Sequence, residues 1–444
     1  LLESCAIMAG LAALAYGGPA LAQVAGAGQG VTGPGLSTPT ISPPGPGPTT
    51  VTTTGDQTII NWTPSNAPVG GVIDFLPTGN ALNFTGTGQY IVLNRFVSGA
   101  GLPIADQIAI NGTVNSIDFA TSGGRGGNIW FYNAGGILIG ATGVLNVGSL
   151  VLTANDVLTA GGLLGPSGEI RFRGASGSTS AITVNGAINA NNALSPGSSY
   201  VALVAPRVVQ AGAVRVDGSV GYVAAEQADI RINGGLFDIN VLVGAEGGNV
   251  ITHTGTTGGP GHVDSNPNDS RVYMVAIPKN LAVTMLVSGQ IGYDAVSAQV
   301  DPNGAVRLSA GYNITNGELN DTPVNATAAN ITVGDTLFSS SVVAHASGTF
   351  AGRPDNMIPP SAPLTPQTGK IIVLGDADFG GDTGATLTAG ADQAIEVDGT
   401  LSLQSLGQLQ ADGSRQGGNA TLSALGGSVT AGFITVASIG AGGI

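Results

Sequence analysis

Three short stretches decide the fold: Gly143-Val-Leu-Asn-Val147, Gly186-Ala-Ile-Asn-Ala190 and Gly212-Ala-Val-Arg-Val216. Each begins with glycine, alternates apolar with other residues, and is flanked by residues that favour turns, which is typical of short strands. Similar units begin at Gly112, Gly168, Gly304, Gly399 and Gly407. Several neighbouring copies lie about 18 to 31 residues apart, close to the repeat length of solenoid proteins.

A parallel β-helix accounts for this unit. One coil holds short strands and turns, alternate side chains point inward, and the next coil satisfies the backbone groups. The 73 glycines among 444 residues fit the turns of such a coil, which often need a positive φ. We predict an all-β fold, a right-handed parallel β-helix with an N-terminal capping region. A jelly roll, a string of sandwiches and a propeller, whose blades repeat every ~40 to 50 residues, are the alternatives.

The exposed end of a stacked sheet invites aggregation, so the first coil needs a cap. Aromatic residues make up only 5% of the chain, yet they gather in its N-terminal third. We expect Trp62, Phe75, Trp130 and Phe131 to pack in this cap and not to form a ligand site.

The first 22 residues have the pattern of a signal peptide that is truncated at its start, because the chain begins with Leu1. The apolar run 6–15 is shorter than the ~20 residues that a membrane span needs. Ala20 and Ala22 before Gln23 match the small-residue pattern of a cleavage site. Cleavage there would remove Cys5, the single cysteine. A buried N-terminal helix is the alternative. Residues 23–50, rich in Pro, Gly, Ser and Thr, are predicted to form a linker.

The charge pattern excludes some partners. The net charge is −14, and the 13 lysines and arginines form no cluster. Nucleic-acid binding needs clustered cations that neutralise phosphates, so we expect no nucleic-acid partner.

Sequence elements between residues 58 and 157 follow a recognisable order. They are Ile59-Ile-Asn-Trp62, Val72-Ile-Asp-Phe75, Ile91–Arg95, Asp106–Val114, Asn128–Gly140 and Gly143–Val157. In this order they resemble the N-terminal secretion domain of the filamentous haemagglutinin family, the exported partner in two-partner secretion. Tyr200–Gly218 resembles the coils that follow this domain. The resemblance covers residues 51–240, and only the repeat style continues beyond it.

One element of the resemblance is altered. Asn133-Ala-Gly-Gly-Ile137 falls where the family has an Asn-Pro-Asn-Gly-Ile signature, but it lacks the proline and the second asparagine. The resemblance makes Asn133, Gly135, Gly136 and Ile137 the candidate secretion-signature turn.

The resemblance implies a function. It implies a secreted or cell-surface adhesin that crosses the periplasm of a Gram-negative bacterium and is recognised by an outer-membrane β-barrel transporter. Folding of the β-helix outside the cell would then help to draw the chain outward. Further partners would be glycans or proteins on host or bacterial surfaces. Residues 51–275 would form the secretion domain, and residues 276–444 would form further β-helix repeats of a truncated chain.

Other chemistry has little support in the sequence. His253, His262 and His345 are too few and too scattered for a metal cluster. Asp376, Asp378 and Asp382 lack the closing glutamate of a Ca²⁺ loop, so we expect an acidic turn. We expect no enzymatic activity and no cofactor. Two alternatives stay open: a stalk for a missing C-terminal effector, and a polysaccharide-cleaving enzyme. For the enzyme, the candidates on one side of the solenoid are Arg171, Arg173, Arg207, Arg215 and Arg231.

Overall fold

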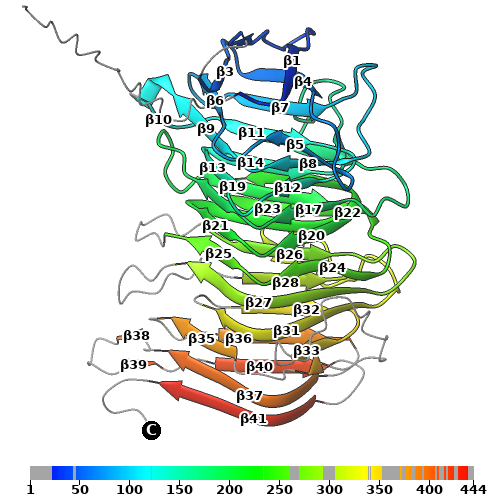
Figure 1. Cartoon of the computed structure of the whole chain (residues 1–444). Coiled ribbons are helices and arrows are strands. Elements are labelled where there is room, and N and C mark those ends of the chain that lie inside the picture. The colour runs from blue at the N-terminus through cyan, green and yellow to red at the C-terminus, as the bar shows by residue number, and fades with distance from the viewer. Residues whose placement is uncertain are drawn as a thin grey trace, which may run out of the picture.

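The computed structural model describes residues 23–43, 47–121, 123–233, 235–260, 270–293, 306–338, 340, 342–352 and parts of 371–438. Apart from the 3-10 turn Phe119–Thr121, the elements in these residues are strands. No helix of the described chain has the length and apolarity needed to cross a bilayer. The strands form successive coils of one solenoid, running from its blue N-terminal end to its red C-terminal end (Figure 1).

Three parallel sheets run along the solenoid, and each coil adds a strand to them. The first sheet contains β4 (Gln57–Pro64), β7 (Ile91–Phe96), β11 (Asn128–Tyr132), β14 (Ser149–Thr153), β19 (Ser199–Ala205), the first part of β22 (Gly218–Asn233), β26 (Val272–Ala276), β28 (Val306–Ala310), β32 (Val342–Ala346), β36 (Thr386–Ala391) and β40 (Asn419–Ala424). The parallel register continues from each coil to the next, as a β-helix requires.

The second and third sheets follow the same rule. The second sheet contains β5 (Val72–Leu76), β8 (Gln107–Ile110), β12 (Ile137–Ile139), β17 (Ala181–Val184), β20 (Arg207–Gln210), β24 (Gly248–His253), β27 (Val283–Tyr293), β31 (Ala329–Phe338), β33 (Phe350–Gly352), β34 (Ile371–Ile372) and β37 (Ile395–Ser405). The third sheet contains β3 (Thr49–Thr52), β6 (Ala81–Gly86), β9 (Thr113–Asp118), β13 (Val144–Val147), β18 (Ala187–Ala190), β21 (Ala213–Val216), β25 (Thr256–Gly259), β35 (Ala377–Gly381) and the C-terminal parts of β27, β31, β37 and β41 (Val429–Ser438). The N-terminal part of β41 pairs with β37 in the second sheet. The predicted parallel β-helix is confirmed.

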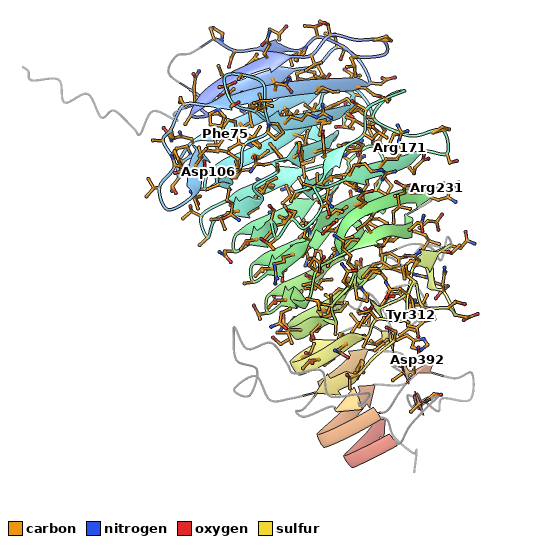
Figure 2. All side chains as sticks on the ribbon, turned by 90° about the vertical axis from the view of Figure 1, so that its right-hand side faces the viewer. Phe75, Asp106, Arg171, Arg231, Tyr312 and Asp392 are labelled. Atoms are coloured by element: carbon orange, nitrogen blue, oxygen red, sulfur yellow. The ribbon has the colours of Figure 1, made fainter. Side chains whose placement is uncertain are left out.

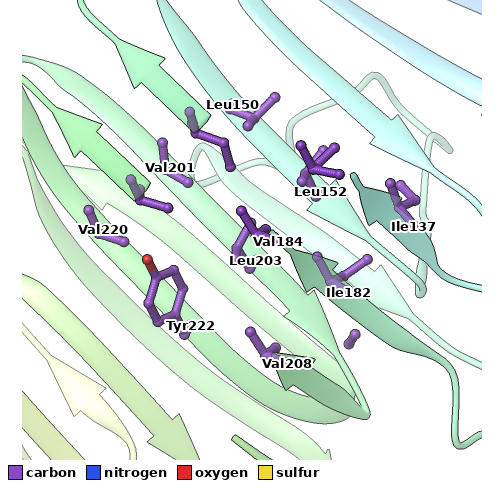
Figure 3. Packing of buried hydrophobic residues seen from close by; sticks show 14 of the residues in the cluster. Ile137, Leu150, Leu152, Ile182, Val184, Val201, Leu203, Val208, Val220 and Tyr222 are labelled. Carbon is purple, nitrogen blue, oxygen red and sulfur yellow. The ribbon is translucent and has the colours of Figure 1, made fainter. Parts of the chain in front are cut away.

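The alternation of residues builds the interior. Leu150 and Leu152 of β14 point inward, as do Val201 and Leu203 of the next strand, β19, and all are fully buried. Figure 3 shows these side chains meeting Ile182 and Val184 of the second sheet in the narrow core. Each added coil therefore buries a few aliphatic side chains, each worth about 1.5 to 3 kcal/mol.

A second core lies outside the first sheet. It is closed by an antiparallel sheet, which we call the covering sheet. This sheet contains β15 (Asp156–Val157), β16 (Glu169–Arg173), the second part of β22, β23 (Leu236–Gly244), β29 (Ile314–Thr315) and β30 (Glu318–Leu319). Its inward side chains, such as Phe172 and Ile230, pack on the outward side chains of the first sheet, such as Val151 and Val223.

The N-terminal cap is built partly from the residues that were predicted to form a linker. β1 (Gly26–Gly30) pairs antiparallel with β4, and β2 (Thr40–Ile41) pairs antiparallel with β3. A Cβ at Gly28 would meet the ring of Trp62, so only glycine lets β1 lie on this indole. The antiparallel strands end the parallel stack, because they pair with its first strands in the opposite direction.

Two other expectations differ from the structure. The unit that begins at Gly168 does not form a coil, because it becomes β16 and pairs antiparallel with β15 and β22. The boundary expected after residue 275 falls inside β26, which pairs in continuous register with β22 and β28.

Two other small antiparallel pairs join β10 (Gly124–Arg125) to β9 and β38 (Gln408–Leu409) to β39 (Arg415–Gln416).

Candidate functional site

The candidate secretion-signature turn, Asn133–Ile137, connects β11 to β12 at one corner of the third coil, where the coils are counted from the one that begins with β4. Asn133 and Ile137 at its two ends are fully buried. The turn closes on itself because the Gly136 amide donates to the Asn133 carbonyl at 2.9 Å and the Asn133 side-chain amide donates to the Gly136 carbonyl at 2.8 Å. An asparagine is well suited to this place, since its short amide can bond to the backbone of its own turn.

The coil before the turn holds it on one side. The Asn133 side-chain amide also donates to the Asp106 carbonyl at 2.8 Å, and the Gly135 amide donates to the Ile104 carbonyl at 3.0 Å. A Cβ at Gly135 would collide with the carbonyl oxygens of Ala105 and Asp106. Asp106 lies near the N-terminal end of the solenoid (Figure 2). Only glycine at position 135 allows this close approach of the two loops.

The coil after the turn holds it on the other side. The Ser180 hydroxyl donates to the Ala134 carbonyl at 2.7 Å. Gly136 has a φ of 94°, which favours glycine, and a Cβ there would collide with the carbonyl oxygen of Ala181. Hydrogen bonds from this turn therefore link the second, third and fourth coils at this corner. Asn133 acts through its side-chain amide, Gly135 and Gly136 act through the backbone, and Ile137 is buried in the core.

Two exposed apolar side chains at this corner belong to loops of the preceding coils. The loop from β4 to β5 carries Val69, and the loop from β7 to β8 carries Leu102, which are 81% and 63% exposed. These strands stack on β11 and β12, so their loops share the corner of the turn. The sequence pattern did not single out this pair as exposed. Their setting in the Gly- and Pro-rich stretches 67–71 and 99–103 is the signal that marks them as loop residues.

The aromatic residues predicted for the cap are divided between the two cores. Trp62, Phe75 and Phe131 lie in the solenoid interior, with ring centroids of Trp62 and Phe75 5.4 Å apart. Trp130 lies in the second core, under the covering sheet, and its indole donates to the Tyr200 hydroxyl at 3.0 Å. The difference follows from strand alternation, because neighbours in β11 point to opposite faces.

The predicted cleavage site is described only at its last residue. Ala20 and Ala22 lie outside the described residues. The Gln23 side chain donates to the Pro43 carbonyl at 3.0 Å, and the Gln23 carbonyl accepts from Asn80 at 2.7 Å.

The arginines proposed for a glycan-cleaving face do not share a surface. Arg171, Arg173 and Arg231 belong to the covering sheet, whereas Arg207 is in the second sheet and Arg215 in the third. Figure 2 shows Arg171 and Arg231 together on one side of the molecule, with Phe75 and Asp106 on the other side of this view. Arg173 forms an ion pair with Asp229 at 2.6 Å, within the covering sheet itself. The five arginines named as candidates for the enzyme alternative therefore do not lie on one side of the solenoid.

Two of the three histidines lie in described residues, at separate levels of the solenoid. His253 is fully buried in the interior, where its ring nitrogens contact the Ser288 carbonyl and the Thr257 hydroxyl. His345 stacks on Tyr312 with ring centroids 4.3 Å apart, and its Nε2 lies 3.4 Å from Asp392. His262, Asp376 and Asp382 lie outside the described residues. Among the residues that the structure does describe, no three histidine, cysteine or carboxylate side chains gather to form a metal site.

Comparisons with known proteins give matches in structure. No family model matches the chain, and no curated protein does. The structure of the HMW1 secretion domain from Haemophilus influenzae matches with 14% identity and a TM-score of 0.39, covering 91% of this chain and 99% of that one. The structure of the filamentous hemagglutinin secretion domain matches with 12% identity and a TM-score of 0.34, covering 88% of this chain and 97% of that one. Both of these solved structures are secretion domains, and the second carries the name of the family that the sequence resembles.

Proposed function

We propose that this chain is an exported, adhesin-like protein whose N-terminal coils are recognised by a partner β-barrel transporter of the outer membrane. It would be exported through the periplasm of a Gram-negative bacterium to the cell surface or the medium. The proposed role needs no cofactor and no catalytic site. Its binding targets would be glycans or proteins of other cell surfaces.

One observation carries the proposal. The sequence elements that resemble the secretion domain form three consecutive coils behind the cap: Ile59–Trp62 lies in β4, Ile91–Arg95 in β7, and Asn128–Gly140 spans β11 and β12. The signature turn, Asn133–Gly136, fastens these coils to the fourth. The elements that carry the resemblance therefore correspond to one continuous part of the solenoid.

The energetics of stacking also support the proposal. Each coil that folds offers backbone groups and an apolar interior to the next coil, so folding can proceed from the capped end. A chain that enters the medium unfolded and folds from its N-terminus would gain free energy with each coil. The lack of cysteine in residues 23–444 is compatible with this route, since no disulfide would have to be broken before transport.

A binding measurement tests the proposed partner. Residues 23–444 would be immobilised and exposed to the periplasmic region of the transporter encoded nearest to the gene. The same region of an unrelated two-partner transporter serves as the control. We expect binding to the cognate region that exceeds binding to the control by at least roughly tenfold, a difference of about 1.4 kcal/mol. Equal binding to both regions would overturn the proposed partnership.

A further inference from the structure

The interior of the solenoid contains a polar chain at the level of β24, β25 and β27. His253 is fully buried, and Thr257 is 1% exposed. His253 Nδ1 lies 2.6 Å from the Ser288 carbonyl oxygen, and its Nε2 lies 2.8 Å from Thr257 Oγ1. The Tyr222 hydroxyl lies 2.7 Å from the same Thr257 oxygen. The phenol ring of Tyr222 stacks on the His253 imidazole with ring centroids 6.2 Å apart. This group sits among the aliphatic residues of the main core.

The chemistry of the bonding groups fixes the direction of each hydrogen bond in this buried polar group. The Ser288 carbonyl can only accept, so Nδ1 of His253 carries the proton. Nε2 of the neutral ring is then an acceptor, and the Thr257 hydroxyl donates to it. The Thr257 oxygen in turn accepts from the Tyr222 hydroxyl. The hydrogen bonds therefore run from Tyr222 to Thr257, from Thr257 to His253 and from His253 to Ser288. All of these donors and acceptors are satisfied only while His253 is neutral.

Protonation of His253 disrupts this arrangement. With a proton on Nε2, the ring must donate to Thr257, whose own hydroxyl then has to turn away from the ring. Either the Thr257 or the Tyr222 hydroxyl then loses its acceptor, which is unfavourable in a buried site. Tyr293 of β27 donates its hydroxyl to the Gly218 carbonyl at 2.6 Å. On the strands of the preceding coil, Arg207 of β20 donates to the Asn249 carbonyl at 3.0 Å, and Arg215 of β21 is exposed. Burial and hydrogen bonds to backbone carbonyls account for the pKa of His253, and no carboxylate among the described residues contributes to it.

The direction of the pH effect follows from burial, which lowers the pKa of His253 from 6.5 to about 4. Below about pH 6.5 the opened coil takes up a proton that the packed coil does not, so acid favours opening. The stabilising effect of the neutral ring is complete above pH 6.5 and is lost as the pH falls toward 4.

We propose that the coil of β24, β25 and β27 is an acid-sensitive joint in the solenoid, at which protonation of His253 opens this level while the N-terminal coils stay packed. The first five coils contain no histidine, because His253 is the first in the sequence. The proposal is independent of the proposed transporter, since it concerns only the folded chain.

Hydrogen exchange measured by mass spectrometry tests the joint. Exchange of residues 23–444 would be compared at pH 8 and pH 5 after correction for the intrinsic rate. We expect the opening constant for peptides from β24, β25 and β27 to rise roughly thirtyfold at pH 5, the ratio that a shift from 6.5 to about 4 gives. Peptides from β9 and β13 should change much less. Equal changes along the solenoid would overturn the proposal.

Two variants separate His253 from other titrating groups. His253→Phe should abolish the extra opening at pH 5, whereas His345→Gln, which changes a histidine on the outer face, should retain it. An acid response that persists in His253→Phe would contradict the proposal. If that variant does not fold, NMR of the protein with ¹³C-labelled histidines gives the same answer. The ring of His253 should stay neutral in the folded protein down to pH 5, and titration near 6.5 without opening would refute the joint.

Discussion

The indole of Trp62 donates a hydrogen bond of 2.9 Å to the side-chain oxygen of Asn94, and both residues are fully buried. Asn94 also donates to the backbone carbonyl of Trp130 at 3.1 Å. These bonds link β4, β7 and β11, the first three strands of the first sheet. A buried amide is costly without partners, so this polar link specifies the packing of the capped end as well as stabilising it.

The contacts of the Trp62 indole predict a loss of stability when this side chain is truncated. Trp62→Ala should lower the free energy of unfolding by about 3 to 5 kcal/mol, because it leaves a cavity beside Phe75 and removes a partner of Asn94. Denaturant unfolding measures this loss. Trp130→Ala should cost a similar amount, but should expose the covering sheet to protease and leave the cap protected. Unchanged unfolding of both variants would contradict the two-core description.

The contacts of the signature turn predict that substitutions at Gly136 and Gly161 differ in how much stability they cost. Gly136→Val should destabilise the chain strongly, because a side chain there meets the Ala181 carbonyl and the φ is 94°. Gly161→Ala is the matched control: its φ is 86°, but nothing lies within 4 Å of the new Cβ. It should cost only about 1 kcal/mol from backbone strain. Thermal unfolding distinguishes them, and equal losses would show that the corner tolerates a side chain.

Export should follow the same turn if the proposed function is correct. Asn133→Ala removes the side-chain amide that donates to the Asp106 and Gly136 carbonyls, so a hydrogen bond between the second and third coils is lost. We expect a lower yield of the chain in the medium, with normal processing of its leader. Gly161→Ala should be exported at the wild-type level. Wild-type export of Asn133→Ala would mean that this turn does not contribute to export.

An asparagine ladder on the outside of the third sheet gives a graded prediction. The side-chain amides of Asn115, Asn146 and Asn189 each donate to the asparagine of the preceding coil, at 2.9, 3.1 and 3.1 Å. Asn115→Ala breaks two of these bonds and should cost about 2 kcal/mol. Asn83→Ala, at the end of the ladder, breaks one and should cost about half as much. Urea unfolding measures both, and a larger loss for Asn83 would contradict the ladder.

The covering sheet predicts where a fragment can end. A fragment 23–275 lacks β29, whose Ile314 pairs with Ile239, and it lacks Lys279, which binds the buried carboxylate of Glu226 at 3.0 Å. Limited proteolysis should cut its covering sheet sooner than that of a fragment 23–325, which retains these groups. The strands β7 and β11 should be protected equally in both. Equal protection of the covering sheet would show that β29 and Lys279 do not stabilise it.

The solenoid was predictable because its signal is local and repeated: a glycine followed by alternating apolar residues. The covering sheet was not, because Gly168–Phe172 has the same alternation as a coil strand and only its long-range partners make it antiparallel. One signal was present in Asp229-Ile-Arg-Ile-Asn-Gly-Gly-Leu-Phe-Asp238, where charged and apolar residues alternate on both sides of a Gly-Gly pair, as in a hairpin. The placement of Trp130 failed for a related reason, since alternation assigns a face but does not tell which face is the interior.

A turn does lie between β11 and β12 at Asn133–Gly136, but its contacts could not be derived from the sequence. The spacing gives no indication that Asn133 bonds to Asp106 of the preceding coil or that Ser180 of the next coil reaches Ala134. Those contacts depend on the stacking register of three coils. The exposed pair Val69 and Leu102 was missed because exposure of a loop residue depends on what its neighbouring loops cover.

The most direct test of the account is the fraction of the chain that leaves the cell in two strains differing only in the neighbouring transporter gene. The full gene would be expressed in both strains, and the medium and cell surface would be assayed by immunoblot. The account predicts that the processed chain appears outside only when the transporter is present and remains in the periplasm otherwise. Equal amounts outside both strains would contradict it.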